Sequence, residues 1–256
     1  MSEPVKTFIV DALQVRVYAN INDLAKDAAK EARMQIQQAV SSAGKCAVIL
    51  ATGNSQIKFL EILTTTPSID WSKVTFFHMD EYLGIDKEHH ASFRKFLSEK
   101  VAKKVNPYLF NYIEGDALEP IDECTRYTNL LKAQPINLCC LGIGENGHLA
   151  FNDPPVAKFD DPHWVKIVKL DLKCRQQQVG EGHFPHLPAV PQYAITLTIP
   201  ALCSAQKMIC VAPERRKAQA VKDTLTGPID PSCPASILRK CPHAILFLDT
   251  ESAALL

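Results

Sequence analysis

The chain has 256 residues, with 28 lysines and arginines against 28 aspartates and glutamates, so its formal net charge is zero. A neutral chain gives no electrostatic argument for binding nucleic acid or a membrane surface, and no apolar run reaches the length of a transmembrane helix. The nine cysteines form no CxxC pair and no spacing typical of a zinc site, so we expect reduced thiols and no bound metal.

The first half of the chain alternates predicted helices with short apolar strands. Strong helix formers begin after an asparagine that can serve as N-cap, and they end before Gly44. We expect helices over residues 22–43, 56–64, 91–103 and 122–133. Apolar runs predict strands over residues 46–50, 74–77 and 136–141. Since only one long helix precedes residue 46, we expect the sheet to begin there.

The second half continues this alternation around a loop that is rich in glycine and proline, at 179–192. We expect strands over residues 164–170, 194–198, 208–211 and 244–248, and helices over residues 214–225 and 234–238. Strands that alternate with helices predict an α/β fold with a mostly parallel sheet covered on both faces. We expect one domain over residues 1–256. Residues 1–7 show no leader pattern, which predicts a cytoplasmic protein.

Three polar loops each follow a predicted strand, at residues 52–56, 78–82 and 142–153. The carboxyl ends of parallel strands meet at one edge of a sheet, and ligands bind there in open α/β folds. We therefore expect the three loops to form one site.

The loop at 142–153 has three glycines within six residues, which allow a tight turn and a close approach to a ligand. It also carries Asn146, His148 and Asp153. His148 can exchange protons, and Asp153 can hold its second nitrogen. The alternative is a glycine-rich surface loop with an incidental histidine, and the two other loops argue against it.

The other two loops supply acids and a candidate anion site. Asp80 and Glu81 are adjacent, so in an extended backbone one can face a pocket while the other holds neighbouring groups. The alternative for them is two solvated acids. The turn from Thr52 to Ser55 offers hydroxyls and free N–H groups at a helix N-terminus, which suits a phosphate, although helix capping alone also explains these residues. Arg175 and Lys217 are candidate phosphate ligands, or charges on a solvated helix face.

Three segments together resemble the glucosamine-6-phosphate deaminase/isomerase family, which also includes the 6-phosphogluconolactonases. They are ATGNS at 51–55, MDEYLG at 79–84 and LGIGENGHLAFNDP at 141–154. Lactonases typically have Gly-Asp-Glu-Arg at 79–82, so the deaminase branch is the better match. The resemblance implies a Rossmann-like α/β fold with a lid segment over the active site.

The resemblance implies conversion of glucosamine 6-phosphate and water to fructose 6-phosphate and ammonia, without metal or organic cofactor. Asp80 would move a proton between carbons 2 and 1 of the opened sugar, with Glu81 as a second acid beside it. His148 would assist ring opening, oriented by Asp153 and with Asn146 in the same relay. The substrate phosphate would contact Thr52, Gly53, Asn54, Ser55, Arg175 and Lys217.

Two residues depart from the usual pattern of this family. Many members have aspartate where this chain has Asn146, and glutamate is usual where it has Asp153. A side chain that is one methylene shorter matters, since misplacement by about 1 Å can cost roughly a hundredfold in rate. Either the backbone compensates or the substrate differs.

Two other functions stay open on the sequence. One is a lactonase that hydrolyses 6-phosphogluconolactone. The other is a sensor that binds a sugar phosphate without turnover, and such sensors usually carry a fused DNA-binding segment, which is not visible here. Small-molecule sugar phosphates are the expected partners, and a homo-oligomer is left open.

Overall fold

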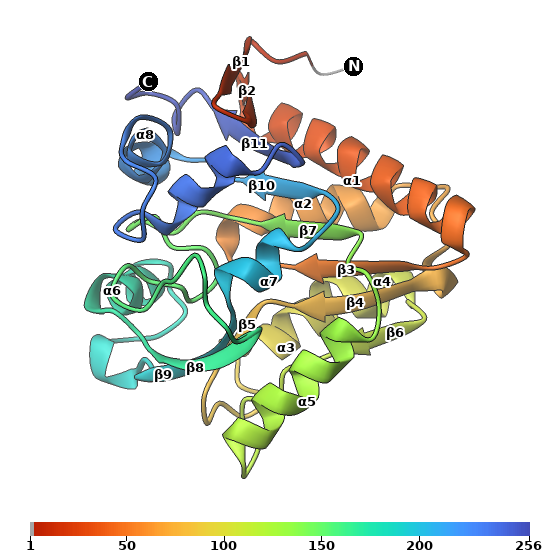
Figure 1. The fold of residues 1–256 in the computed structure, drawn as a ribbon, viewed down its shortest axis with the longest axis vertical. Coiled ribbons are helices and arrows are strands. Elements are labelled where there is room, and N and C mark those ends of the chain that lie inside the picture. Colours follow the sequence, from red (N-terminus) through yellow and green to blue (C-terminus); the bar gives the residue numbers. More distant parts are fainter. Residues whose placement is uncertain (1–2) are drawn as a thin grey trace.

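A large sheet of eight strands forms the centre of the protein in this computed structural model, which describes residues 3–256 (Figure 1). Met1 and Ser2, the start of the segment in which no leader is predicted, lie outside the described residues. The strand order is β1-β2-β11-β10-β7-β3-β4-β6. All neighbours are parallel except β1 and β2, which form a hairpin. The predicted mostly parallel sheet is therefore confirmed.

The strands of the large sheet are short and mostly buried. They are β1 (Lys6–Val10), β2 (Leu13–Tyr18), β3 (Cys46–Leu50), β4 (Val74–His78), β6 (Leu109–Asn111), β7 (Leu138–Leu141), β10 (Met208–Val211) and β11 (Ala244–Asp249). Every residue of β3 is buried, as expected of a strand that has helices on both faces. Its alternate residues belong to two separate apolar clusters, with Ala47 and Ile49 on one face and Val48 and Leu50 on the other.

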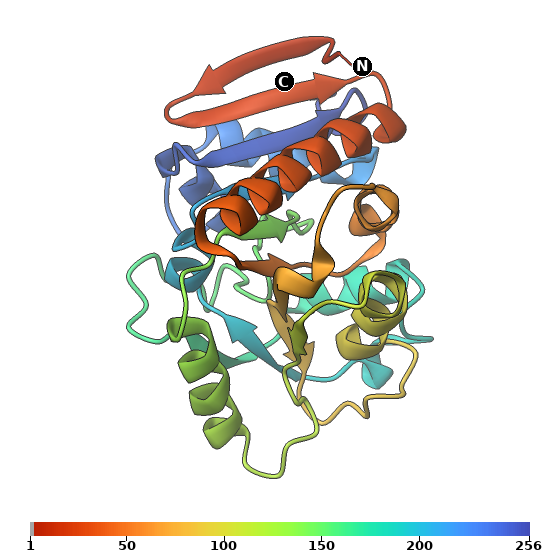
Figure 2. The ribbon, with the colours of Figure 1, turned by 90° about the vertical axis from the view of Figure 1, so that its right-hand side faces the viewer.

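Helices cover both faces of this sheet. The long helix α1 (Ile21–Ala43) and α2 (Asn54–Thr65) pack on one face, and Figure 2 shows α1 in front of the sheet, below the β1–β2 hairpin. The opposite face is covered by α5 (Pro120–Lys132), α7 (Ile199–Cys203) and α8 (Ala218–Thr226). None of the helices in the part that the structure describes is long and apolar enough to cross a membrane.

A second, antiparallel sheet of three strands lies beside the large one. Its order is β5 (Asp80–Tyr82), β9 (Tyr193–Leu197) and β8 (Val165–Lys169). It supports α3 (Phe93–Leu97), which continues through a π-helical turn into α4 (Lys103–Val105), and α6 (Leu172–Gly180). Because β5 follows β4 after a single residue, the chain passes from one sheet to the other at the predicted site loop.

One expectation about the sheets is wrong. The large sheet begins with the hairpin before α1 and not at residue 46. Leu13, Val15 and Val17 of β2 are buried and alternate with two partly exposed polar residues. The sequence therefore has the alternation that is typical of a half-buried strand there. The predicted strands at 164–170 and 194–198 exist but belong to the small antiparallel sheet.

Candidate active site

One cavity lies at the carboxyl ends of β3, β4 and β7, where the three predicted loops meet. Its volume is about 80 Å³. The lining residues come from the three loops, from α3, from the segment that includes α6, and from the end of the turn before α8. They are Ala51, Thr52, Gly53, Ser55, Met79, Asp80, Phe93, Gly142, Ile143, Gly144, His148, Ala150, Phe151, Gln177, Gln178, Glu181, His183 and Lys217.

Asp80 presents a buried carboxylate to this cavity. The residue opens β5 and is paired with Thr196 of β9, which fixes its backbone in the extended form. Only 7% of it is exposed, and its carboxylate has no hydrogen-bond or ion-pair partner among residues 3–256. Burial, with the charge of Glu81 as a smaller cause, raises the pKa of Asp80 well above its ordinary value of 3.8. A carboxylate in this state is a stronger base than usual.

Glu81 points away from the cavity and organises the backbone. Its side chain is fully buried and accepts hydrogen bonds from the backbone N–H groups of Tyr82, Phe93 and Arg94, at 3.0, 3.1 and 2.9 Å. The hydroxyl of Ser92 donates a fourth, at 2.9 Å. Glu81 thus caps the N–H groups at the start of α3 and does not line the cavity. The alternation predicted for the adjacent acids is confirmed.

His148, Asp153 and Asn146 form one polar cluster in the loop after β7. Nδ1 of His148 lies 3.0 Å from Oδ1 of Asp153, and the same oxygen accepts from the amide Nδ2 of Asn146 at 2.9 Å. The second oxygen of Asp153 accepts from the backbone N–H of Asp171 at 3.1 Å. Burial opposes ionisation of Asp153, but contacts with His148, Asn146 and this N–H lower its pKa. The His148 ring passes so close to Gly144 that a Cβ there would clash with it.

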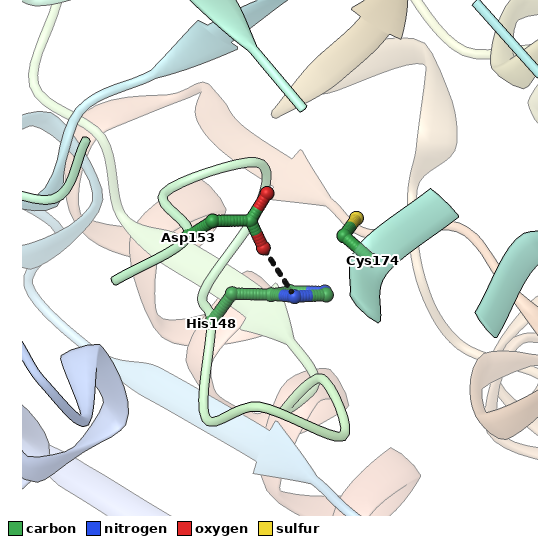
Figure 3. Close-up of side chains that lie close together, drawn as sticks. All are labelled: His148, Asp153 and Cys174. Atoms are coloured by element: carbon green, nitrogen blue, oxygen red, sulfur yellow. Dashed lines mark ion pairs between the residues drawn. The ribbon is translucent and has the colours of Figure 1, made fainter. Parts of the chain in front are cut away.

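Cys174 of α6 completes a group that has the donor types of a metal site. Figure 3 shows it beside His148 and Asp153, and the three ligand atoms lie within 4.8 Å of one another. Burial, together with nearby aspartates, raises the pKa of the Cys174 thiol well above 9.0, whereas metals bind the thiolate. Both oxygens of Asp153 already accept hydrogen bonds or contact His148. The chemistry of the group fits a hydrogen-bonded support for His148 better than a metal centre.

The turn from Thr52 to Ser55 opens α2 toward the cavity. Gly53 has a φ of 99°, in the region that favours glycine, and no side chain caps this helix end. Free backbone N–H groups therefore face the cavity beside Thr52 and Ser55, as an anion site requires. Asn54 does not line the cavity, since its amide donates to the carbonyl oxygen of Glu181 at 3.4 Å.

Lys217 brings a cation to the same cavity, from the turn that precedes α8. Only 3% of the residue is exposed, and its ammonium has no hydrogen-bond or ion-pair partner within the described chain. Burial lowers its pKa, although acidic neighbours led by Glu181 oppose this effect. A buried cation without a partner is costly, so an incoming anion would stabilise it.

Arg175 is not brought into the cavity. Its Nη2 donates to the carbonyl oxygens of Leu187 and Val190, at 2.9 and 2.8 Å. The guanidinium thus ties α6 to the loop that follows it, and we call α6 and this loop together, residues 172–192, the lid. The structure offers no phosphate-binding role for this side chain.

Four residues of this lid line the cavity and are not identified by the sequence analysis. They are Gln177, Gln178, Glu181 and His183. Gln178 accepts a hydrogen bond from the hydroxyl of Tyr82 at 2.7 Å, which anchors α6 on the small sheet. No periodic or loop pattern marks these positions, because the tertiary contacts of α6 decide which of its residues face the cavity.

The chain matches the family of glucosamine-6-phosphate isomerases and 6-phosphogluconolactonases over residues 19–246. It is 31% identical over 229 residues to a glucosamine-6-phosphate deaminase of Listeria monocytogenes serotype 4a, which covers 89% of this chain and 94% of the relative. A glucosamine-6-phosphate deaminase of Exiguobacterium sibiricum is 34% identical over 208 residues, which are 81% and 80% of the two chains.

Two solved structures extend the comparison to the fold. A monomeric glucosamine-6-phosphate deaminase superposes with a TM-score of 0.86 and 25% identity, covering 94% of this chain and 99% of the other. A 6-phosphogluconolactonase from Trypanosoma brucei superposes with a TM-score of 0.77 and 18% identity, covering 98% and 100%. The deaminase is therefore the more similar of these two structures.

Proposed function

The chain belongs to the family of glucosamine-6-phosphate isomerases and 6-phosphogluconolactonases, and we propose that it is a glucosamine-6-phosphate deaminase. It converts glucosamine 6-phosphate and water to fructose 6-phosphate and ammonia. The observation that carries this proposal is the unpartnered Asp80 carboxylate in the cavity that also holds His148 and Lys217. The curated deaminases that match most of the chain support it.

Asp80 carries the isomerisation in this proposal. Once the ring is open, its carboxylate removes the proton from carbon 2, which bears the amine, while the aldehyde oxygen at carbon 1 takes up a proton, and an enolamine forms. Return of the proton to carbon 1 leaves an imine at carbon 2. Water then adds to this imine, and ammonia leaves to give the ketose. A carboxylate with a raised pKa suits both directions of the proton transfer.

His148 and its support act on the ring oxygen. Opening the sugar ring moves a proton from the anomeric hydroxyl to the ring oxygen, and an imidazole can accept and return that proton. Asp153 holds Nδ1 of His148, which leaves Nε2 for the substrate. Asn146 and the Asp171 backbone fix Asp153 in turn.

The phosphate group binds at the other end of the cavity. Lys217 supplies a charge, and the free N–H groups that open α2 supply directed donors, with the hydroxyls of Thr52 and Ser55 beside them. Reduced thiols among the described residues support the further inference that the enzyme works in the cytoplasm.

The first test is ammonia release from glucosamine 6-phosphate by the purified chain and by Asp80→Asn. We expect the variant to lose several orders of magnitude in kcat while it still binds inorganic phosphate. The matched control is Asp86→Asn, an exposed acid in the segment after β5, which should keep full activity. Unchanged turnover in Asp80→Asn would remove Asp80 from the mechanism.

A second test addresses the phosphate end. Lys217→Ala should raise KM for glucosamine 6-phosphate roughly tenfold to a hundredfold, the usual loss for a charged hydrogen bond. Lys222→Ala, an exposed lysine of the helix α8 that follows Lys217, serves as the control. An equal effect of Lys217→Ala on unphosphorylated glucosamine would argue against a phosphate-binding role.

A further inference from the structure

Glu181 places a carboxylate at the phosphate end of the cavity. It follows directly on α6, lines the cavity together with Thr52, Gly53 and Lys217, and its side chain is only 5% exposed. An acid in this position is unexpected, because a phosphate dianion and a carboxylate repel each other at close range.

The polar groups around this acid are directed at it. Oε1 of Glu181 accepts from Nη1 of Arg216 at 2.9 Å and from Nε2 of Gln177 at 2.7 Å, and Oε2 lies 3.3 Å from Nε2 of His183. Burial opposes its ionisation, but His183, Arg216 and Lys217 lower the pKa of Glu181 to about 2. Glu181 is therefore negatively charged at neutral pH.

The position of Glu181 also closes the cavity. Its backbone carbonyl accepts from Asn54 at the start of α2, so the residue connects the lid to the phosphate-binding turn. The cavity that remains, about 80 Å³, is small beside ordinary ligand pockets of roughly 300 to 1,000 Å³. A sugar phosphate needs the space that the Glu181 side chain and the lid now occupy.

We propose that the Glu181 carboxylate competes with the phosphate group of the substrate for Arg216. In the free enzyme this carboxylate binds Arg216, and the phosphate displaces it on binding. Arg216 does not line the cavity now, and its Nε keeps a second partner, Glu214 at 2.7 Å. Departure of Glu181 therefore removes the hydrogen-bond partner of Nη1 and leaves this atom for the phosphate, with Glu145 3.8 Å away, while Glu214 keeps the side chain in place. Glu181 thus sets the affinity of the site for phosphorylated ligands. The inference rests on the proposed phosphate end of the site.

The test measures binding of inorganic phosphate by titration calorimetry, which needs no turnover. Glu181→Gln keeps the shape of the side chain and removes its charge, and we expect phosphate to bind roughly tenfold more tightly than to the wild-type protein. The matched control is Asp223→Asn, which removes the charge of an exposed acid of α8 outside the cavity, and should change the affinity less than twofold. Phosphate binding by Glu181→Gln that is equal to or weaker than that of the wild-type protein would overturn the proposal.

A second variant tests whether the result for Glu181→Gln depends on the position that its new amide adopts. Glu181→Ala should also bind phosphate more tightly, because the negative charge is gone and Arg216 retains Glu214, although Gln177 and His183 lose their contacts with the carboxylate. Weaker binding by Glu181→Ala would show instead that Glu181 positions the phosphate ligands. The proposed deaminase activity is tested separately by ammonia release. If phosphate binding responds as expected but no ammonia is released, the competitor role stands and the reaction assignment fails.

Discussion

Asn146 and Asp153 each depart from the usual pattern of the family, and the structure shows that the two departures fit each other. The Asn146 amide donates to Asp153, and the shorter acid still reaches both Asn146 and His148. An aspartate at 146 would bring two carboxylates to the 2.9 Å that now separates a donor from an acceptor. These contacts favour compensation for the lost methylene within this chain.

This coupling predicts a non-additive pair of substitutions. Asn146→Asp alone should lower kcat/KM roughly a hundredfold, because repulsion between the two acids displaces the support of His148. Combined with Asp153→Glu, it should recover part of the activity. A double-mutant cycle on kcat/KM measures this coupling, which we expect at about 1–3 kcal/mol. Strictly additive losses would show that the two positions act independently.

The two catalytic carboxylates differ in pKa, and this predicts the acid side of the pH profile. Burial raises the pKa of Asp80 above 3.8, whereas contacts with His148 and Asn146 lower that of Asp153. The base works ionised, so kcat should fall as the pH drops through the raised pKa of Asp80, while Asp153 stays ionised. Activity that remains constant down to pH of about 4 would contradict this assignment.

At the scale of the element, Arg175 stabilises the conformation of the lid. Its two hydrogen bonds to the carbonyl oxygens of Leu187 and Val190 join α6 to the following loop. Arg175→Ala should therefore speed amide hydrogen exchange over residues 181–192 and lower kcat/KM, while inorganic phosphate binds within about twofold of its wild-type affinity. Arg215→Ala, at an exposed arginine that forms no hydrogen bond or ion pair with the lid within residues 3–256, is the control. A large loss of phosphate affinity in Arg175→Ala would restore the phosphate-binding role that the resemblance implies.

The central elements could be predicted because they carry strong local signals. The strands at 46–50, 208–211 and 244–248 are short apolar runs, and they match β3, β10 and β11 within a residue. The helix expected over 22–43 matches α1, which ends at Gly44 as expected, although its N-cap is Asn20 and not Asn22, the asparagine that opens the predicted range. Asp80 and His148 can be selected from the sequence as candidate site residues for a related reason, since each lies in a loop directly after such a strand.

Local sequence signals do not predict the small sheet or the position of the lid. Residues 165–169 read as an ordinary strand, and only their antiparallel pairing with β9 separates them from the large sheet. Glu181 lies at the end of α6, and neither α6 nor the loop after it has a strong apolar periodicity. Tertiary contacts with Arg216 and Tyr82 place this segment over the cavity.

At the scale of the whole molecule, the site imposes a cost on the fold. Asp80 has a folded-state pKa above its unfolded value, so above that pKa its ionised form is disfavoured by folding. No hydrogen bond or ion pair within residues 3–256 offsets this burial of charge. The free energy of unfolding at neutral pH is therefore lower than it would be with a neutral side chain at this position.

Asp80→Asn should consequently raise Tm at pH 7, in the same variant that loses activity. With roughly 2–4 °C expected per kcal/mol for a chain near this size, a gain of a few degrees is measurable by calorimetry. The gain should shrink as the pH falls through the raised pKa, because protonation then removes the cost from the wild-type protein. Asp86→Asn, which removes an exposed charge, should leave Tm nearly unchanged at each pH. A lower Tm for Asp80→Asn at pH 7 would mean that the carboxylate holds the structure together, and its freedom to act as a base would then need another explanation.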